Sequence, residues 1–317
     1  MGPRQPSAAP AHLTMQTTMQ PDFCPGISKT DLRPKSAFIV HVYSRLIFCA
    51  VVLLCLSAGA QQKVDSVQES QKKARAVLDK MIEAMGGQAW LNVQDLKSEI
   101  RYGSFYHGTV NATTVLHRFW QWPDKDRLEF NVPYNISVYF WQWPFKDQGK
   151  NAVLIFLHNG DRGYERTYRG TKFEDIEQLK RYLLSREYSM SMVLRQWMKD
   201  PNVALFYDGP TIAENRSAEK VTIMKGDEAV SLLIASDTHL PIKKVYVVRN
   251  PVYHDHDEEV EVYDNWKMVQ GINTPYNTLM THNGEMVSQQ YVLSISYNNQ
   301  LDSSLFDPGP INYDRKK

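Results

Sequence analysis

The first clear pattern of apolar and polar positions along the chain has a helical period. Between about Ser66 and Met85, apolar residues recur every three or four positions, at Ala74, Leu78 and Met81, with charged residues between them. Gly86-Gly87 follows, and glycine commonly ends a helix because it readily adopts a positive φ. The pattern predicts one amphipathic helix over about 66–85.

Strand-like segments dominate the rest of the chain. Aromatic and β-branched residues separated by turn residues predict strands at about 96–106, 112–121, 127–132 and 135–141, at the apolar run 152–157 and from Gly163. Further strands are expected at about 203–207, 219–224, 228–236, 242–250, 258–269, 272–282 and 286–297. Asn283-Gly284 and Gly226-Asp227 are strong hairpin signals within this second group.

A helical interlude over about 173–199 separates the two groups of strands, with an interruption expected between Ser185 and Ser189. Asp200-Pro201 ends it, because proline disfavours helix at the residue before it. The order predicts an α+β protein, mainly antiparallel β, built as a half-open curved β-barrel wrapped around helices.

The first 60 residues differ in character from the rest. Residues 1–35 have no apolar period and read as disordered or as a misassigned start, while 36–60 read as a signal peptide. Arg45 precedes about eleven apolar residues, and Ala58-Gly59-Ala60 has the form that a signal peptidase accepts. The alternative is an uncleaved anchor over Ala37–Leu56, which Arg45 makes costly. We therefore expect export to the periplasm, cleavage after about Ala60, and one domain over 61–317.

Composition excludes several classes of function for the mature chain. The first 60 residues hold five of the 36 Lys/Arg and two of the 35 Asp/Glu, which leaves 31 and 33 and a net charge of −2. A near-neutral chain without a basic run argues against nucleic acid as a partner. All three cysteines (Cys24, Cys49 and Cys55) precede the cleavage site, so the mature chain has no thiol ligand or nucleophile.

Sequence motifs for catalysis or cofactor binding are lacking, so we expect neither an enzyme nor a cofactor. His254 and His256 lie in a run of acidic residues that resembles a metal site. The run follows Pro251 between two strands, where a solvated hairpin tip is expected, so no metal is predicted.

Aromatic side chains supply the candidate binding surface. In 117–122, Arg118, Trp120 and Trp122 share one strand face, and large apolar groups occupy both faces. One face can line a cavity, or both can be covered by helices and loops. Methionines of the helical interlude can adapt to an irregular ligand, although a stripe at helical spacing is usually core.

Several short motifs, in order, resemble those of a known family. They are Ile82-Glu83-Ala84-Met85-Gly86-Gly87, Trp122-Pro123-Asp124-Lys125, Asn159-Gly160-Asp161-Arg162-Gly163-Tyr164, Thr238-His239-Leu240-Pro241, Val269-Gln270-Gly271-Ile272 and Leu305-Phe306-Asp307-Pro308. Together, behind a signal peptide, they resemble the outer-membrane lipoprotein-sorting proteins of the LolA/LolB type over most of 70–308. The resemblance implies a half-open barrel whose apolar cavity holds acyl chains, with Arg101 and Arg118 as candidates for a cavity arginine. It does not fix the function, because the family also includes envelope sensors.

The leading hypothesis is a periplasmic protein that holds a lipid or lipoprotein acyl group, with peripheral contact with a membrane compatible with that role. The residues expected to line the cavity are Trp120, Trp141, Leu183, Met190, Leu194 and Trp197. The alternative is an envelope sensor or interaction module that uses the same sheet to bind an envelope protein.

Overall fold

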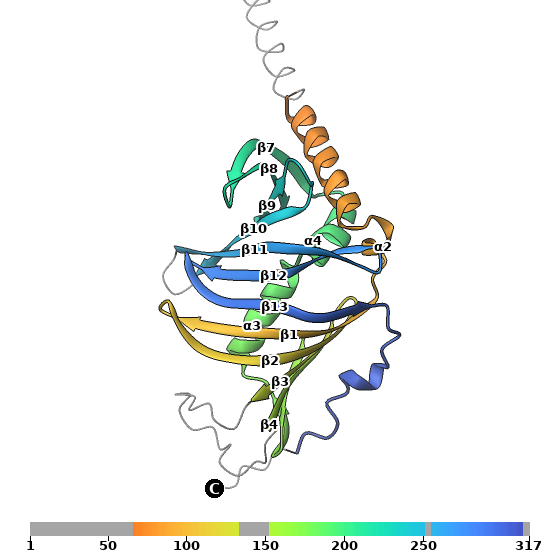
Figure 1. Cartoon of the computed structure of the whole chain (residues 1–317), viewed down its shortest axis with the longest axis vertical. Coiled ribbons are helices and arrows are strands. Elements are labelled where there is room, and N and C mark those ends of the chain that lie inside the picture. Colours follow the sequence, from red (N-terminus) through yellow and green to blue (C-terminus); the bar gives the residue numbers. More distant parts are fainter. Residues whose placement is uncertain (1–65, 133–151, 251–254, 313–317) are drawn as a thin grey trace, which may run out of the picture. The chain divides into compact units, whose positions relative to one another are not determined.

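The computed structural model describes residues 66–132, 152–250 and 255–312, all within one unit, Ala60–Lys317 (Figure 1). The chain is helical over 66–85. The other helices are α2 (Gln88–Leu91), α3 (Ile176–Glu187), α4 (Met190–Arg195) and the 3-10 turns η2 (Trp197–Lys199) and η3 (Ser303–Phe306). Within the described ranges, no helix combines the length and the apolar character needed to cross a membrane.

A sheet of 13 antiparallel strands forms the body of this unit. The strands before α3 are β1 (Asp95–Tyr106), β2 (Thr109–Gln121), β3 (Lys125–Val132), β4 (Ala152–Asn159), β5 (Arg162–Thr167) and β6 (Gly170–Phe173). Those after η2 are β7 (Ala204–Ala213), β8 (Arg216–Lys225), β9 (Glu228–Ala235), β10 (Pro241–Asn250), β11 (Asp255–Val269), β12 (Ile272–His282) and β13 (Glu285–Tyr297).

The strands join as two meanders that meet where β1 pairs with β13. The spatial order is β6-β5-β4-β3-β2-β1-β13-β12-β11-β10-β9-β8-β7, so the sheet stays open between β6 and β7. The predicted fold class is therefore confirmed, as an open antiparallel sheet with a few helices.

Most predicted elements within the described residues lie where the pattern placed them, with two differences. Strand β6 was missed because its four residues are too short for a periodic signal. The run from Asp255 to Glu259 belongs to β11 rather than to a hairpin tip, since it pairs in register with Glu258 opposite Val247. The expected strand at 135–141 lies outside the described residues. The helical interlude breaks at Tyr188-Ser189, where the Ser189 hydroxyl accepts a bond from the Met192 amide and starts α4.

Helix α3 shows how strongly the sheet bends. The Tyr182 hydroxyl contacts Asp126 on β3, and the carbonyl of Tyr188 accepts a hydrogen bond from Lys244 on β10. These strands are six places apart in the sheet, which is roughly 29 Å on a flat sheet. The helix rises only about 9 Å between the two tyrosines. The sheet therefore has to curve around α3, which lies behind the central strands in Figure 1.

One half of the concave side is filled by a hydrophobic core. The helix over 66–85 and α4 pack there against β7–β10, and the main contributors are fully buried: Leu78, Met81, Val221, Ile223, Val230 and Ile234, all 0 % exposed. The predicted helical stripe is thus the face that meets the sheet.

A C-terminal strap, residues 298–312, covers the convex side of β3–β6. The Asp95 carboxylate accepts bonds from the amides of Asn299 and Leu301, and Arg127 donates to the carbonyl of Leu305. Phe306 is 0 % exposed. The strap therefore anchors the outer side of this half of the sheet.

Replacing Phe306 with alanine should remove that anchor. We expect Phe306→Ala to lower the free energy of unfolding by about 3–5 kcal/mol, because it leaves a cavity under the strap. Urea unfolding measures the change. Ser304→Ala, at an exposed position of the same turn, is the matched control and should stay within about 0.5 kcal/mol of the parent. Equal values for the two variants would contradict an anchoring strap.

Candidate binding site on the inner face of the sheet

The register of β1–β4 defines which side chains share the concave side, here called the inner face. Ser98, Arg118, Leu128 and Phe156 stand opposite one another across the four strands. The next such row holds Leu96, Trp120, Asp126 and His158. Because Tyr182 of α3 contacts both Asp126 and His158, this is the face that α3 crosses.

The inner face over β1–β4 is apolar but incompletely covered. Tyr102, Phe130 and Phe156 form a row of edge-to-face rings with centroids 5.9 Å apart. Trp120, Leu128 and Phe130 are each partly exposed. None of the twelve residues of α3 is fully buried, although the helix lies across this face. Helix α3 therefore does not seal this face of the sheet.

Arg118 stands on this face, on β2. Its Nε and Nη2 donate to the two carboxylate oxygens of Asp126 at 3.1 and 2.8 Å, and Asp126 also accepts from the Tyr182 hydroxyl at 3.4 Å. Burial lowers the pKa of Arg118, but Asp126 and, less strongly, Tyr182 and Glu261 outweigh this and raise it. The Arg118 side chain is nevertheless 38 % exposed, whereas Asp126 is 1 % exposed. Arg118 is therefore paired with a buried carboxylate and is still reached by solvent.

The two arginines that the resemblance offers as candidates, Arg101 and Arg118, lie on opposite faces of the sheet. Arg101 is exposed and pairs in register with Tyr291 and Val115 on the convex side. Arg118 points to the inner face.

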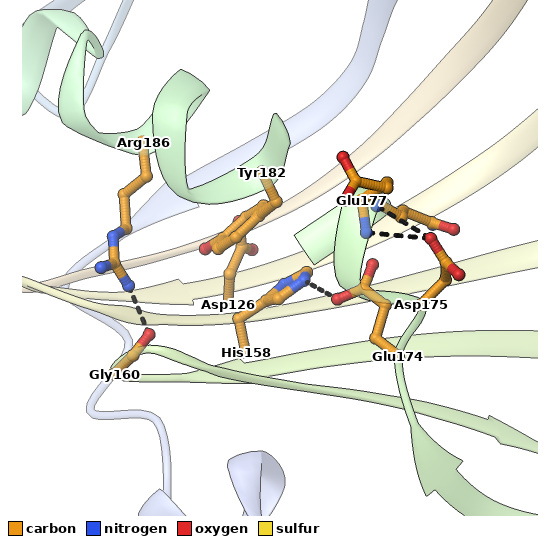
Figure 2. Close-up of polar contacts among 9 residues, drawn as sticks. Asp126, His158, Gly160, Glu174, Asp175, Glu177, Tyr182 and Arg186 are labelled. Carbon is orange, nitrogen blue, oxygen red and sulfur yellow. Dashed lines mark hydrogen bonds and ion pairs between the residues drawn. The ribbon is translucent and has the colours of Figure 1, made fainter. Parts of the chain in front are cut away.

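A buried histidine fixes the start of α3 (Figure 2). His158 Nε2 and Glu174 Oε2 are 2.9 Å apart, both side chains are 2 % exposed, and the imidazole stacks on the Tyr182 ring at 3.4 Å. Nδ1 of His158 has no partner among the described residues. Gly163 makes room for this pair, since a Cβ there would lie 2.2 Å from Glu174 Oε2. Next to it, the Asp175 carboxylate accepts from the amides of Glu177 and Gln178 and caps α3.

A second buried polar group holds the other end of α3. Lys244 is 1 % exposed, and its ammonium donates at 2.8 Å to Glu261 and to the carbonyl of Tyr188. Tyr188 stacks on Tyr246 with ring centroids 4.5 Å apart. Burial, with the carboxylates of Glu228 and Glu187, raises the pKa of Tyr188 to about 12. Both ends of the helix are therefore fixed by paired polar groups.

The residues predicted to line a cavity fall into three groups. Trp120, Leu183 and Met190 are partly exposed on the inner side. Leu194 and Trp197 are 4 % and 1 % exposed and pack in the core beside the helix over 66–85. Trp141 lies outside the described residues. Lining by this set stays a prediction.

The acidic histidine run brings no ligand cluster together. His256 is exposed on β11, and His254 lies outside the described residues. In the parts of the chain that the structure describes, no three His, Cys, Asp or Glu side chains are placed to hold a metal ion.

Sequence reasoning missed four residues of this site: Asp126, His158, Glu174 and Tyr182. The alternation along β2 does place Arg118 and Trp120 on one face. No local signal links His158 to Glu174, which lie 16 residues apart, or Asp126 to Tyr182, which lie 56 apart.

Two surface hollows lie elsewhere on the described chain. One, of about 610 Å³, runs beside the helix over 66–85 and includes Gln71, Arg75 and Leu205. The other, of about 380 Å³, includes Gln270, Ile272 and Tyr297. Neither contains a residue predicted to bind the ligand.

Comparison with known proteins finds likeness in fold. No protein-family model matches the chain, and neither does any curated protein sequence. A DUF1329 family protein from Desulfovibrio piger is 10 % identical with a TM-score of 0.49, covering 74 % of this chain and 97 % of its own. An outer membrane lipoprotein-sorting domain from Vibrio parahaemolyticus is 9 % identical with a TM-score of 0.45, at 72 % and 97 % coverage. A LolA superfamily protein from Nitrosomonas europaea is 11 % identical with a TM-score of 0.42, at 74 % and 97 % coverage.

The structures found include LolA-superfamily and outer membrane lipoprotein-sorting proteins, the group that the sequence motifs resemble. At these identities and TM-scores the likeness concerns the fold alone.

The buried pair before α3 can be tested through stability. Glu174→Leu removes the partner of His158 Nε2 and leaves a buried imidazole without a hydrogen bond, so we expect a loss of about 1–3 kcal/mol in the free energy of unfolding. Glu177→Leu, at an exposed position of the same helix, is the control, and urea unfolding measures both. If His158→Phe combined with Glu174→Leu is as unstable as the sum of the single changes, the two side chains are not coupled.

Proposed function

We propose that this chain is an exported periplasmic binding protein that holds a lipid or lipoprotein acyl group against the inner face of β1–β4, beneath α3. The observation that carries the proposal is the contrast between the two halves of the concave side. Over β7–β10 the core side chains Val221, Ile223, Val230 and Ile234 are 0 % exposed, whereas Arg118 on the other half remains 38 % exposed.

The physical basis of binding is burial of apolar surface. An acyl chain contributes about 0.8 kcal/mol for each methylene that it buries. The ring row of Tyr102, Phe130 and Phe156 offers apolar surface along which a chain can lie. We assign Trp120 and Leu183, both partly exposed, to the lining. Met190 is partly exposed but packs against the core over β7–β10, so we assign it to the boundary between the two halves. Leu194 and Trp197 join it only when α4 moves away from the core.

The polar groups of this half do not oppose such a ligand. Asp126 is neutralised by Arg118, and His158 is bonded to Glu174, so the charges are already paired. His158 and Glu174 are closed to solvent at 2 % exposure each, so a substrate cannot reach them as a general base. A binding role therefore fits the site better than catalysis.

Substitution on the inner face should weaken ligand binding. We expect Trp120→Ala to reduce the affinity for a fluorescent fatty acid by about tenfold or more, because it removes a large apolar contact. Phe119→Ala is the matched control, since Phe119 is the next residue and points to the opposite face. Fluorescence titration measures both.

Native mass spectrometry of protein from the periplasm provides the independent check, with a co-purified lipid as the expected result. Consistently ligand-free protein that takes up no fatty acid would overturn the proposal.

Export can be tested separately. We expect mass spectrometry of the protein from a periplasmic fraction to show a mature amino terminus at Gln61, because Ala58-Gly59-Ala60 precedes it. A membrane-bound product that retains 36–60 would instead support the anchor.

A further inference from the structure

Arg195, the last residue of α4, is a buried cation without a counter-ion. It is 7 % exposed, and within the described ranges it makes no hydrogen bond or ion pair with any side chain or carbonyl. Its contact is with Trp122, whose ring centroid lies 3.8 Å from Cζ of Arg195. Burial lowers the pKa of Arg195, as expected for a cation that no carboxylate compensates.

The other cations on the inner side are compensated. Each has a carboxylate partner within 3.0 Å: Arg118 with Asp126, Arg186 with Asp161, Lys225 with Glu187 and Lys244 with Glu261. Keeping one charge largely buried and unpaired is costly, because its remaining exposure restores only part of its hydration and no carboxylate replaces the rest. Such a cost indicates a partner that is supplied from outside the chain.

The geometry leaves the donors of Arg195 available. Stacking on an indole uses the flat face of the guanidinium, while its five N–H groups point outward in the plane. His158 Nδ1 is the buried side-chain atom without a partner in the described chain. The unpaired nitrogens of Arg195 therefore each keep some contact with solvent-accessible space.

Trp120 connects this position with the inner face of β1–β4. Its ring centroid lies 6.0 Å from that of Trp122, and Arg118 stands two residues before it on the same strand face. The distance along the chain from Arg118 to Trp122 is about 13 Å. An elongated ligand can therefore lie on the inner face with one end at Arg195.

We propose that Arg195, stacked on Trp122, binds the oxyanion of an amphiphilic ligand, a carboxylate or a phosphate, whose apolar chain lies along the inner face. The planar fork of arginine matches both oxyanions with two parallel hydrogen bonds. The proposal rests on the proposed function for the apolar chain, but the oxyanion site itself depends only on Arg195 and Trp122.

Calorimetric titration of the full chain tests the site with four probes: palmitate, monohexadecyl phosphate, methyl palmitate and inorganic phosphate. We expect the two anionic amphiphiles to bind at least about tenfold more tightly than the neutral ester, the gain typical of a charge-assisted hydrogen bond. Arg195→Met should bind all three amphiphiles with the affinity of the ester. Arg101→Met, at an exposed arginine on the convex side, should retain the parent preference.

Thermal unfolding separates binding from a structural role. Because Arg195→Met removes an unpaired buried charge, its midpoint should equal or exceed that of the parent. A lower midpoint with an unchanged preference for anions would show that Arg195 serves packing alone and would overturn the inference. If Arg195→Met does not fold, Arg195→Lys decides: it keeps the charge but loses the planar fork, so the preference for anions should fall.

The probes also distinguish the two proposals. Binding of methyl palmitate without any preference for anions would overturn the oxyanion site and leave the proposed function standing. Binding of inorganic phosphate as tightly as monohexadecyl phosphate, lost in Arg195→Met, would support the oxyanion site and count against an acyl ligand.

Discussion

The structure depends on one constraint, the fixing of α3 at both ends across the concave side of the sheet. At the start of the helix His158 pairs with Glu174, and at the other end Lys244 donates to the carbonyl of Tyr188. Both contacts are buried and polar, so breaking either leaves an unsatisfied group in a region of low dielectric. Together with the bond from Tyr182 to Asp126, they hold strands that are six places apart against one short helix, and the sheet bends accordingly.

The bend produces two unequal halves because two different helices cover them. The helix over 66–85 carries a broad apolar stripe, and its residues Ala74, Leu78 and Met81 are 0 % exposed against β7–β10. Helix α3 has no fully buried residue and is held by polar contacts instead. Apolar packing closes one half, whereas polar fixation at the ends allows α3 to span the other half without filling it. The partial exposure of the α3 side chains is thus a consequence of how the helix is attached.

The sequence predicts the local part of this arrangement and little of the long-range part. Period-2 alternation places Arg118 and Trp120 on one face, and Ser189 accounts for the break between α3 and α4, because both effects act between near neighbours. The pairing of β1 with β13 joins residues about 200 positions apart, such as Leu96 and Tyr297. Arg195 and Trp122, 73 residues apart, meet for the same reason. The burial of Leu194 and Trp197 follows from the sheet's bend, which no local pattern encodes.

The cost of burying an unpaired charge also explains how charges are distributed on the inner side. A hollow that receives an apolar chain has to avoid unpaired charges, because a buried charge without a partner opposes transfer of the chain from water. Arg118, Lys244 and their carboxylates are neutralised within the chain. Arg195 is paired only with the face of an indole, an interaction that leaves its N–H groups free. Arg118, Arg186, Lys225 and Lys244 have carboxylate partners in the fold, so the unpaired Arg195 marks the place at which a ligand can contribute charge of its own.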